Sequence, residues 1–153
     1  MQMCYLMMTR NDLSLTLELR EIDNLSLIIA AACHDLGHDG FNNSYHLNAI
    51  TKRAIDSNDV SIQENYHAAE LFRIMQKEDC NFLEYLSRTE FIHFRKRVTS
   101  LILATDMSKH AAMISSMKQV VSVNNIKNNL DVVHWLHSED KDGEVNELSL
   151  FVH

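Results

Sequence analysis

The sequence predicts an all-α fold, a multi-helix domain that spans residues 1–153. The 153 residues include no proline and only three glycines, so the residues that punctuate strand-rich folds are scarce. Hydrophobic residues make up 46% of the chain, which is enough for one sizeable core. Apolar residues also recur at helical spacing along much of the chain. These observations favour helices joined by polar loops.

The N-terminal segments are the hardest to assign. Residues 1–9 are apolar and compatible with a helix. Leucines at alternate positions over 13–19 are typical of a strand, but the scarcity of breakers and the helical pattern that follows argue against one. Asp23 or Asn24 can cap the next helix, over 25–35, whose composition predicts burial on most sides.

The middle of the chain predicts further helices. Gly37 and Gly40 open a loop, a short helix is expected over 44–55, and residues 56–59 are turn-like. From residue 61 to 75 apolar side chains again recur at helical spacing.

A long helix is expected to begin at the capping-box pattern of Ser87 and Glu90 and to end near Thr105. Another amphipathic helix is expected over 108–123. Four of its residues are predicted to face inward: Ala111, Ile114, Met117 and Val121.

Both ends of the chain resemble the interior of a longer domain. Residues 124–143 are rich in asparagine and then acidic, which predicts a flexible loop. A final helix is expected from about Val145 and stops in mid-pattern, while residues 1–9 begin without a cap. The domain is therefore expected to be incomplete at both ends.

Composition excludes some functions. The net charge is −7, with 14 Lys+Arg against 21 Asp+Glu, so no basic face for nucleic acid is predicted. The basic residues at 95–97 are interpreted as a solvated helix face. Three cysteines without CxxC spacing indicate reduced thiols and a cytoplasmic location. The longest apolar run is too short to cross a membrane, although a longer protein could be tethered through other regions.

One motif carries metal chemistry. His34 and Asp35 lie where an apolar helix meets a glycine-containing loop, and His38 follows one turn later. Imidazole and carboxylate are ligands for zinc and other divalent cations. A lone histidine is more often a core residue bonded to a carbonyl group. Two histidines flanking an acid would be costly to bury without a cation, which favours a metal site.

The longer string from His34 to Tyr45, HDLGHDGFNNSY, resembles the signature of class I 3′,5′-cyclic-nucleotide phosphodiesterases, which are HD-type metal-dependent phosphohydrolases. The block ENYH at 64–67 resembles a Glu-Asn-His-His element of that family, and LATDMSKH at 103–110 resembles its Ala-Thr-Asp-Met-Ser block. The resemblance is strongest over 24–118 and weaker over 145–153. It covers roughly the N-terminal half of a catalytic domain.

This resemblance implies hydrolysis of the 3′-phosphoester bond of cAMP or cGMP to the 5′-monophosphate, in signal transduction. It implies that His34 and Asp35 ligate a first metal, usually zinc, and that Asp35 bridges to a second, usually magnesium or manganese. Four residues would hydrogen-bond the waters around the metals: His38, Glu64, His67 and Thr105. Asn43 would help to shape the pocket.

Departures from the family pattern lower the expected activity. The family's general-acid histidine, in an upstream element, has no counterpart in this chain, so the chain alone is expected to be inactive or very weak. Asp39 replaces a common proline, which predicts a less rigid loop. The preferred cyclic nucleotide and the oligomeric state stay open.

Two alternatives remain. Another HD-type nucleotide phosphohydrolase would explain His34 and Asp35 but not the blocks at Glu64 and Thr105. A non-catalytic helical remnant that serves as an interaction module would lack bound metal.

Several residues near the motifs also have structural interpretations. Glu64 and His67 could form an ordinary surface pair, and Thr105 could bond back to its own helix. Asp106 and Ser108 are interpreted as a helix stop and an N-cap. Five other histidines are interpreted as lying outside the site: His46, His93, His110, His134 and His137.

Overall fold

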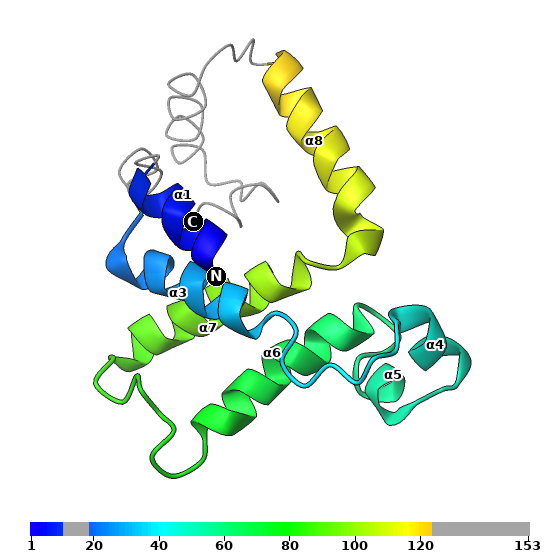
Figure 1. Cartoon of the computed structure of the whole chain (residues 1–153), viewed down its shortest axis with the longest axis horizontal. Helices are drawn as coiled ribbons and strands as arrows, with labels where there is room; N and C mark the ends of the chain where they lie inside the picture. Colours follow the sequence, from blue (N-terminus) through cyan, green and yellow to red (C-terminus); the bar gives the residue numbers. More distant parts are fainter. Residues whose placement is uncertain (11–18, 124–153) are drawn as a thin grey trace.

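The computed structural model describes residues 1–10 and 19–123, and all regular secondary structure in these ranges is helical (Figure 1). The predicted all-α class is therefore confirmed. The elements are α1 (Gln2–Arg10), α3 (Glu21–Cys33), α4 (Asn43–Asn48), α5 (Lys52–Asp56), α6 (Ile62–Met75), α7 (Arg88–Leu103), the 3₁₀ turn η1 (Met107–Lys109) and α8 (His110–Val123).

The helices α3, α6 and α7 form the centre of the fold. Helix α7 packs against both α3 and α6, and α1 lies against α3. The short helices α4 and α5 lie beside the beginning of α6, while α8 leads away from the centre after η1 (Figure 1). None of the described helices has the length and apolar character needed to cross a membrane.

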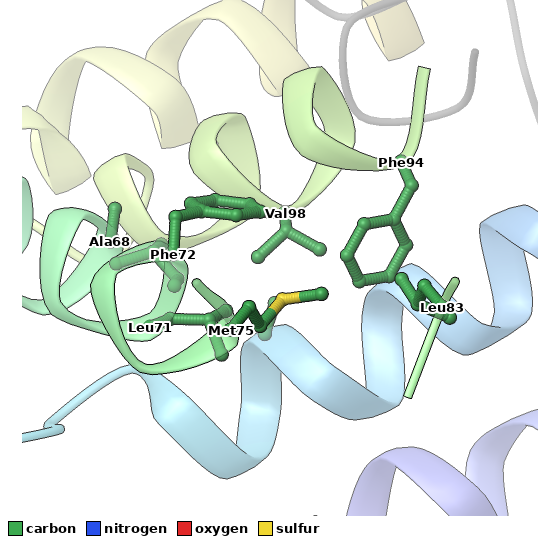
Figure 2. Packing of buried hydrophobic residues seen from close by; sticks show 9 residues of the cluster. Ala68, Leu71, Phe72, Met75, Leu83, Phe94 and Val98 are labelled. Atoms are coloured by element: carbon green, nitrogen blue, oxygen red, sulfur yellow. The ribbon is translucent and has the colours of Figure 1, made fainter. Parts of the chain in front are cut away.

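The core follows the apolar stripe predicted for α7. Phe94, Val98 and Ile102 are spaced by four residues, so they share one face of the helix, and all three are fully buried. The rings of Phe72 and Phe94 meet edge to face, with centroids 6.5 Å apart. Figure 2 shows this cluster, whose remaining buried members are Ala30, Ala68, Leu71, Met75 and Leu83.

The predicted capping box is confirmed at the start of α7. The Ser87 hydroxyl accepts a hydrogen bond from the Glu90 backbone N–H, and the Glu90 carboxylate accepts one from the Ser87 backbone N–H. This reciprocal pair satisfies two backbone donors at the helix end.

The first central helix begins earlier than predicted. Helix α3 starts at Glu21 after an extended Arg20, so Asp23 and Asn24 lie in its first turn and neither is the N-cap. The Asp23 carboxylate instead contacts Arg20, His93 and Arg97. The helix is also less buried than predicted, because only Ser26 and Ala30 are fully buried in it.

The single helix predicted over 44–55 is two helices. Ile50 adopts a positive φ of 47°, which interrupts the helical backbone between α4 and α5. Thr51 then caps α5, its hydroxyl accepting a hydrogen bond from the Ala54 backbone N–H.

The interpretation of residues 95–97 as a solvated face is wrong for Arg97. Its side chain is only 9% exposed, and its Nε lies 3.2 Å from Asp23 Oδ1. Burial lowers the pKa of Arg97, and the Asp23 carboxylate opposes that effect. Arg97 therefore belongs to a buried ionic contact between α7 and α3.

The helix predicted from Ser108 begins with η1, whose N-cap is Asp106 and not Ser108. The predicted inward face of α8 is also wrong, since Ala111, Ile114 and Met117 are exposed. Among the described elements, η1 is the main packing partner of α8. The side chain of Val121 lies outside the described residues.

Three further predictions fall largely on residues that the structure does not describe. They are the rejected strand pattern over 13–19, the flexible loop over 124–143 and the helix from Val145.

Candidate active site

A cavity of about 900 Å³ lies where three segments distant in sequence meet. They are the 34–47 stretch after α3, the start of α6 and the turn over 104–110. All seven residues selected from the sequence line this cavity: His34, Asp35, His38, Asn43, Glu64, His67 and Thr105.

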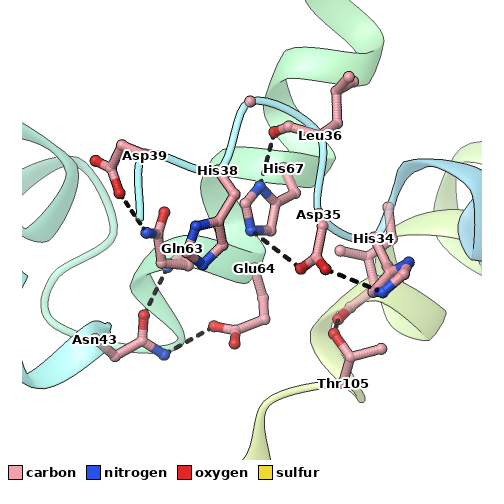
Figure 3. Close-up of polar contacts among 12 residues, drawn as sticks. His34, Asp35, Leu36, His38, Asp39, Asn43, Gln63, Glu64, His67 and Thr105 are labelled. Carbon is pink, nitrogen blue, oxygen red and sulfur yellow. Dashed lines mark hydrogen bonds and ion pairs between the residues drawn. The ribbon is translucent and has the colours of Figure 1, made fainter. Parts of the chain in front are cut away.

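Two imidazoles present their Nε2 atoms towards one carboxylate. His34 Nδ1 lies 3.1 Å from the Ala31 carbonyl oxygen and His67 Nδ1 lies 2.8 Å from that of Leu36, so both Nδ1 atoms donate. In the neutral rings each Nε2 then carries a lone pair. These Nε2 atoms lie 3.3 Å and 4.0 Å from the oxygens of Asp35 (Figure 3).

Lone pairs facing a carboxylate repel it unless a positive charge lies between them. That charge is either a proton on the imidazole or a metal cation. Both residues line the cavity, and Asp35 has 68% of its side chain exposed and His34 has 47%, so both are open to an ion from solution. The arrangement at Asp35 thus suits a cation.

The described residues offer an incomplete ligand set for that cation. Within residues 1–10 and 19–123, no group of three His, Cys, Asp or Glu side chains is arranged to hold a metal ion. His34 and Asp35 therefore fit as two ligands of an open site, with water completing the coordination.

His38 has the opposite tautomer from its two neighbours. Its Nδ1 accepts a hydrogen bond of 2.9 Å from the Gly40 backbone N–H, so Nε2 carries the proton in the neutral ring. The ring stacks on His67 with centroids 5.6 Å apart. The cavity wall therefore combines one imidazole donor with two imidazole acceptors.

Asn43 fixes the orientation of Glu64. The Asn43 Nδ2 group donates to Glu64 Oε2 over 3.0 Å, and the Gln63 backbone N–H donates to Asn43 Oδ1 over 2.9 Å. Because the amide is held from both ends, it fixes the position of one oxygen of Glu64, which lines the cavity (Figure 3).

Thr105 bonds back to its own helix. Its hydroxyl donates to the Ile102 carbonyl oxygen over 2.7 Å. The hydroxyl oxygen keeps acceptor capacity towards the cavity, so Thr105 can accept a hydrogen bond from a water but cannot donate one at the same time.

Ser61, Asp106 and His110 are among the cavity residues that the sequence interpretation missed, and the interpretation of His110 as lying outside the site is wrong, since it lines the cavity. Asp106 is buried and accepts hydrogen bonds from the Ser61 hydroxyl at 2.7 Å and the Ser108 backbone N–H at 2.9 Å. Although burial raises the pKa of Asp106, these hydrogen bonds lower it overall. The one signal in the sequence was the position of Asp106 directly after Thr105.

The loop at Asp39 is held by more contacts than predicted. Asp39 Oδ1 accepts hydrogen bonds from Gln63 Nε2 at 2.7 Å and from the Phe41 backbone N–H at 3.3 Å. Arg53 Nη1 lies 3.2 Å from Asp39 Oδ2, and His46 Nε2 lies 3.3 Å from Oδ1. His46 itself is buried outside the cavity, as its interpretation as a non-site residue requires.

We expect Asp39 to contribute to acid stability. Burial by itself raises the pKa of Asp39, but hydrogen bonds from Gln63 and Phe41 and the charge of Arg53 lower it from 3.8 to about 2. A lowered pKa stabilises the fold above pH 3.8, and this contribution is lost as the pH falls through about 2. Allowing for solvent screening, Asp39→Asn should cost about 1 kcal/mol at neutral pH.

The measurement is urea unfolding of the wild type and Asp39→Asn between neutral pH and pH 2. The difference in unfolding free energy should shrink as the pH falls through this window. Asp56→Asn, at an exposed residue of α5, is the control and should show a difference near zero. A difference for Asp39→Asn that does not depend on pH would contradict the expectation.

The sequence model of the family described as 3′5′-cyclic nucleotide phosphodiesterase matches residues 1–152. A probable 3′,5′-cyclic-AMP phosphodiesterase of Caenorhabditis elegans is 39% identical over 113 residues, which are 74% of this chain and 17% of that protein. The high affinity cGMP-specific 3′,5′-cyclic phosphodiesterase 9A of Homo sapiens is 42% identical over 106 residues, 69% of this chain and 18% of that protein.

Solved structures agree with the sequence comparisons. The phosphodiesterase domain of the RhoPDE fusion protein from Salpingoeca rosetta superposes with a TM-score of 0.70 at 32% identity. The match covers 88% of this chain and 38% of that domain. The chain thus spans less than half of the similar solved domain and less than a fifth of these two curated relatives.

Proposed function

Because this chain belongs to the 3′,5′-cyclic nucleotide phosphodiesterase family, we propose that its cavity is part of a site for metal-assisted hydrolysis of cAMP or cGMP. The bond cleaved is the 3′-phosphoester and the product is the 5′-monophosphate. Such enzymes depend on metal ions.

The observation that carries this proposal is the pair of imidazole nitrogens directed at Asp35. His34 and His67 each donate through Nδ1 to a backbone carbonyl, which leaves Nε2 as an acceptor facing the same carboxylate. A divalent cation bound by His34 and Asp35 would offset the repulsion between these groups, and it also brings positive charge to a chain whose net charge is −7. An anionic phosphodiester needs that charge in order to bind.

We assign the first cation, zinc, to His34 and Asp35, and a second, magnesium or manganese, to Asp35. When bound, such ions lower the pKa of water and offset the negative charge on the phosphate. The side chains around them would orient the reacting water. His38 offers a donor, while Glu64 and Thr105 offer acceptors.

The same ligand set suggests weak metal binding. Two side-chain ligands leave several positions to water, whereas a closed zinc site has about four ligands from the protein. We therefore propose that the 153-residue chain binds zinc weakly and hydrolyses cyclic nucleotides slowly. Magnesium, which keeps most of its waters, should lose less affinity than zinc.

The test is to incubate the chain with cAMP, cGMP or a 5′-nucleotide in the presence of Mn²⁺ and to separate the products by chromatography. We expect a 5′-monophosphate from the cyclic substrates, and none when a chelator is added. Glu64→Gln should lower the rate by about 10- to 100-fold. Glu70→Gln on the same helix is the matched control, since Glu70 pairs with Arg73 and does not line the cavity.

Other outcomes would favour the alternatives. Hydrolysis of the 5′-nucleotide without hydrolysis of cyclic substrates would favour another HD-type phosphohydrolase. Absence of both metal binding and hydrolysis would favour a non-catalytic interaction module and contradict the proposal.

A further inference from the structure

A polar cluster beside the cavity, of which only Gln63 lines it, has no role in the proposed function. It consists of Asp39 in the loop after α3, Arg53 in α5 and Gln63 in α6, and we call these three residues the loop anchor. The loop they contact carries His38 and leads to Asn43, so its conformation decides where two cavity residues lie.

Gln63 is the centre of the loop anchor. Its side chain is buried, with only 4% of the residue exposed. The amide oxygen accepts from Arg53 Nη1 at 2.5 Å, and the amide nitrogen donates to Asp39 Oδ1 at 2.7 Å and to the Phe41 carbonyl oxygen at 2.6 Å. A buried amide whose oxygen and nitrogen are both hydrogen-bonded has one orientation. A flip would place its nitrogen against a donor and its oxygen against acceptors.

Arg53 holds the other side of the loop. Its Nη1 contacts Asp39 Oδ2 at 3.2 Å, and its Nη2 donates to the Gly37 carbonyl oxygen at 3.2 Å. The guanidinium also lies 3.5 Å above the centroid of the Tyr66 ring. Gly37 approaches the same ring so closely that an added Cβ would lie 3.1 Å from it.

The loop anchor is connected to the cavity at two places. Gly37 and Asp39 are the neighbours of His38 on either side, so both flanks of this histidine are tied to Arg53. The Gln63 backbone N–H donates to Asn43, which in turn donates to Glu64. Gln63 therefore links the buried amide to the carboxylate on the cavity wall (Figure 3).

We propose that Asp39, Arg53 and Gln63 are positioning residues, which fix the loop over 37–43 and thereby the placement of His38 and of the Asn43–Glu64 pair. The consequence for catalysis rests on the proposed function of the cavity. The placement of Asn43 does not, and it can be measured separately.

The decisive substitution is Gln63→Glu, which nearly preserves the shape of the side chain. It replaces the donating amide nitrogen with an oxygen that faces Asp39 Oδ1 and the Phe41 carbonyl oxygen, so two hydrogen bonds become repulsive contacts. Adding Asp39→Asn to this variant supplies a new amide donor opposite the new carboxylate. The double variant therefore restores the contact with reversed polarity.

The control is Lys52→Gln. Lys52 precedes Arg53 in α5 and forms an exposed ion pair with Asp56 at 2.6 Å, with 86% of the lysine side chain exposed. Its loss changes the charge beside the loop anchor without removing a contact to the loop. Lys52→Gln should therefore leave both the Asn43 amide signal and the Mn²⁺ affinity unchanged.

The first readout is the side-chain amide signal of Asn43 in proton–nitrogen correlation spectra of the full chain. Gln63→Glu should shift or broaden it, and the double variant should return it towards the wild-type position. The second readout is Mn²⁺ affinity by paramagnetic resonance. It should fall about tenfold in Gln63→Glu and recover to within about threefold in the double variant.

The direction of the change in Mn²⁺ affinity distinguishes a positioning role of Gln63 from a direct electrostatic effect of the added charge. An added carboxylate near the cavity should strengthen cation binding through Coulomb attraction, so weaker binding requires displacement of the site. The proposal is overturned if Gln63→Glu changes neither readout, or if the double variant rescues neither.

Two further results, absence of Mn²⁺ binding and unfolding of Gln63→Glu, also bear on the proposal. If Mn²⁺ does not bind the wild type, the proposed function fails, and the Asn43 signal alone decides the positioning role. If circular dichroism shows that Gln63→Glu is unfolded, Arg53→Lys replaces it. Arg53→Lys keeps the positive charge but loses the paired contacts of the guanidinium with the loop. It should shift the Asn43 signal by less than Gln63→Glu would, while the chain stays folded. An unshifted signal in folded Arg53→Lys also overturns the proposal.

Discussion

Asp35→Ala is expected to lower the affinity of the chain for Zn²⁺ and Mn²⁺ by at least about 100-fold, more than a substitution in the surrounding hydrogen-bond shell. Asp35 is the carboxylate that both His34 Nε2 and His67 Nε2 face, at 3.3 Å and 4.0 Å. Without it the two imidazoles lose the anion between them, and each proposed cation loses a charged ligand. The measurement is calorimetric titration of each metal into the wild type and the variant.

Asp56→Ala is the matched control for this titration. Asp56 is an exposed aspartate with 51% of its side chain accessible, it pairs with Lys52, and it does not line the cavity. The control should bind metal as the wild type does. Metal binding by Asp35→Ala at wild-type affinity would show that the ion binds elsewhere, and the assignment of the cavity to a phosphodiesterase metal site would fail with it.

Asp23→Ala is expected to lower the free energy of unfolding by about 3 kcal/mol, in the range for a broken buried ion pair. The side chains of Asp23 and Arg97 are each 9% exposed, with Nε and Oδ1 separated by 3.2 Å. His93 Nε2 lies 2.7 Å from the same carboxylate oxygen. Although burial alone raises the pKa of Asp23, hydrogen bonds from His93 and Arg20 lower it overall, so this carboxylate is charged at neutral pH.

The comparison for this prediction is Glu21→Ala, measured by urea unfolding alongside Asp23→Ala. Glu21 is an exposed acid in the same first turn of α3, so both substitutions remove one negative charge from the same helix end. Glu21→Ala should cost less than about 1 kcal/mol. Equal costs for the two variants would mean that the helix end, and not the contact with Arg97, accounts for the stability.

Local patterns in the sequence predicted the features that depend on near neighbours. The stripe of Phe94, Val98 and Ile102 and the capping box of Ser87 involve spacings of three or four residues, which a helix makes directly. The seven residues chosen for the site also line one cavity. They were selected as motif blocks, and the fold brings the blocks together.

The errors concern contacts between distant residues. Nothing near Arg97 in the sequence shows that its partner is Asp23, 74 positions away, so a run of three basic residues was interpreted as solvated. Asp23 was interpreted as a cap for the same reason, because two of its partners, His93 and Arg97, lie on α7. The break at Ile50 had no signal either, since a positive φ there falls on a β-branched residue and not on a glycine.

Asp39 shows the same limit within the candidate site. The absence of a proline at this position predicted a less rigid loop. That prediction depends only on the backbone freedom of one residue. The stabilising contacts come from Arg53 and Gln63, 14 and 24 positions further along the chain, and no local pattern pairs them with Asp39.

The hydrogen bond between Ser61 and Asp106 has a consequence for how the cavity assembles during folding. It joins residues 45 positions apart, and the chain between them is the pair of helices α6 and α7 with their connection. Closing so long a loop carries an entropic cost that is recovered only once the two helices have packed. The cavity wall should therefore form late, after the core around Phe94, and substitutions that slow the docking of α6 onto α7 would delay the appearance of metal binding during refolding by the same factor.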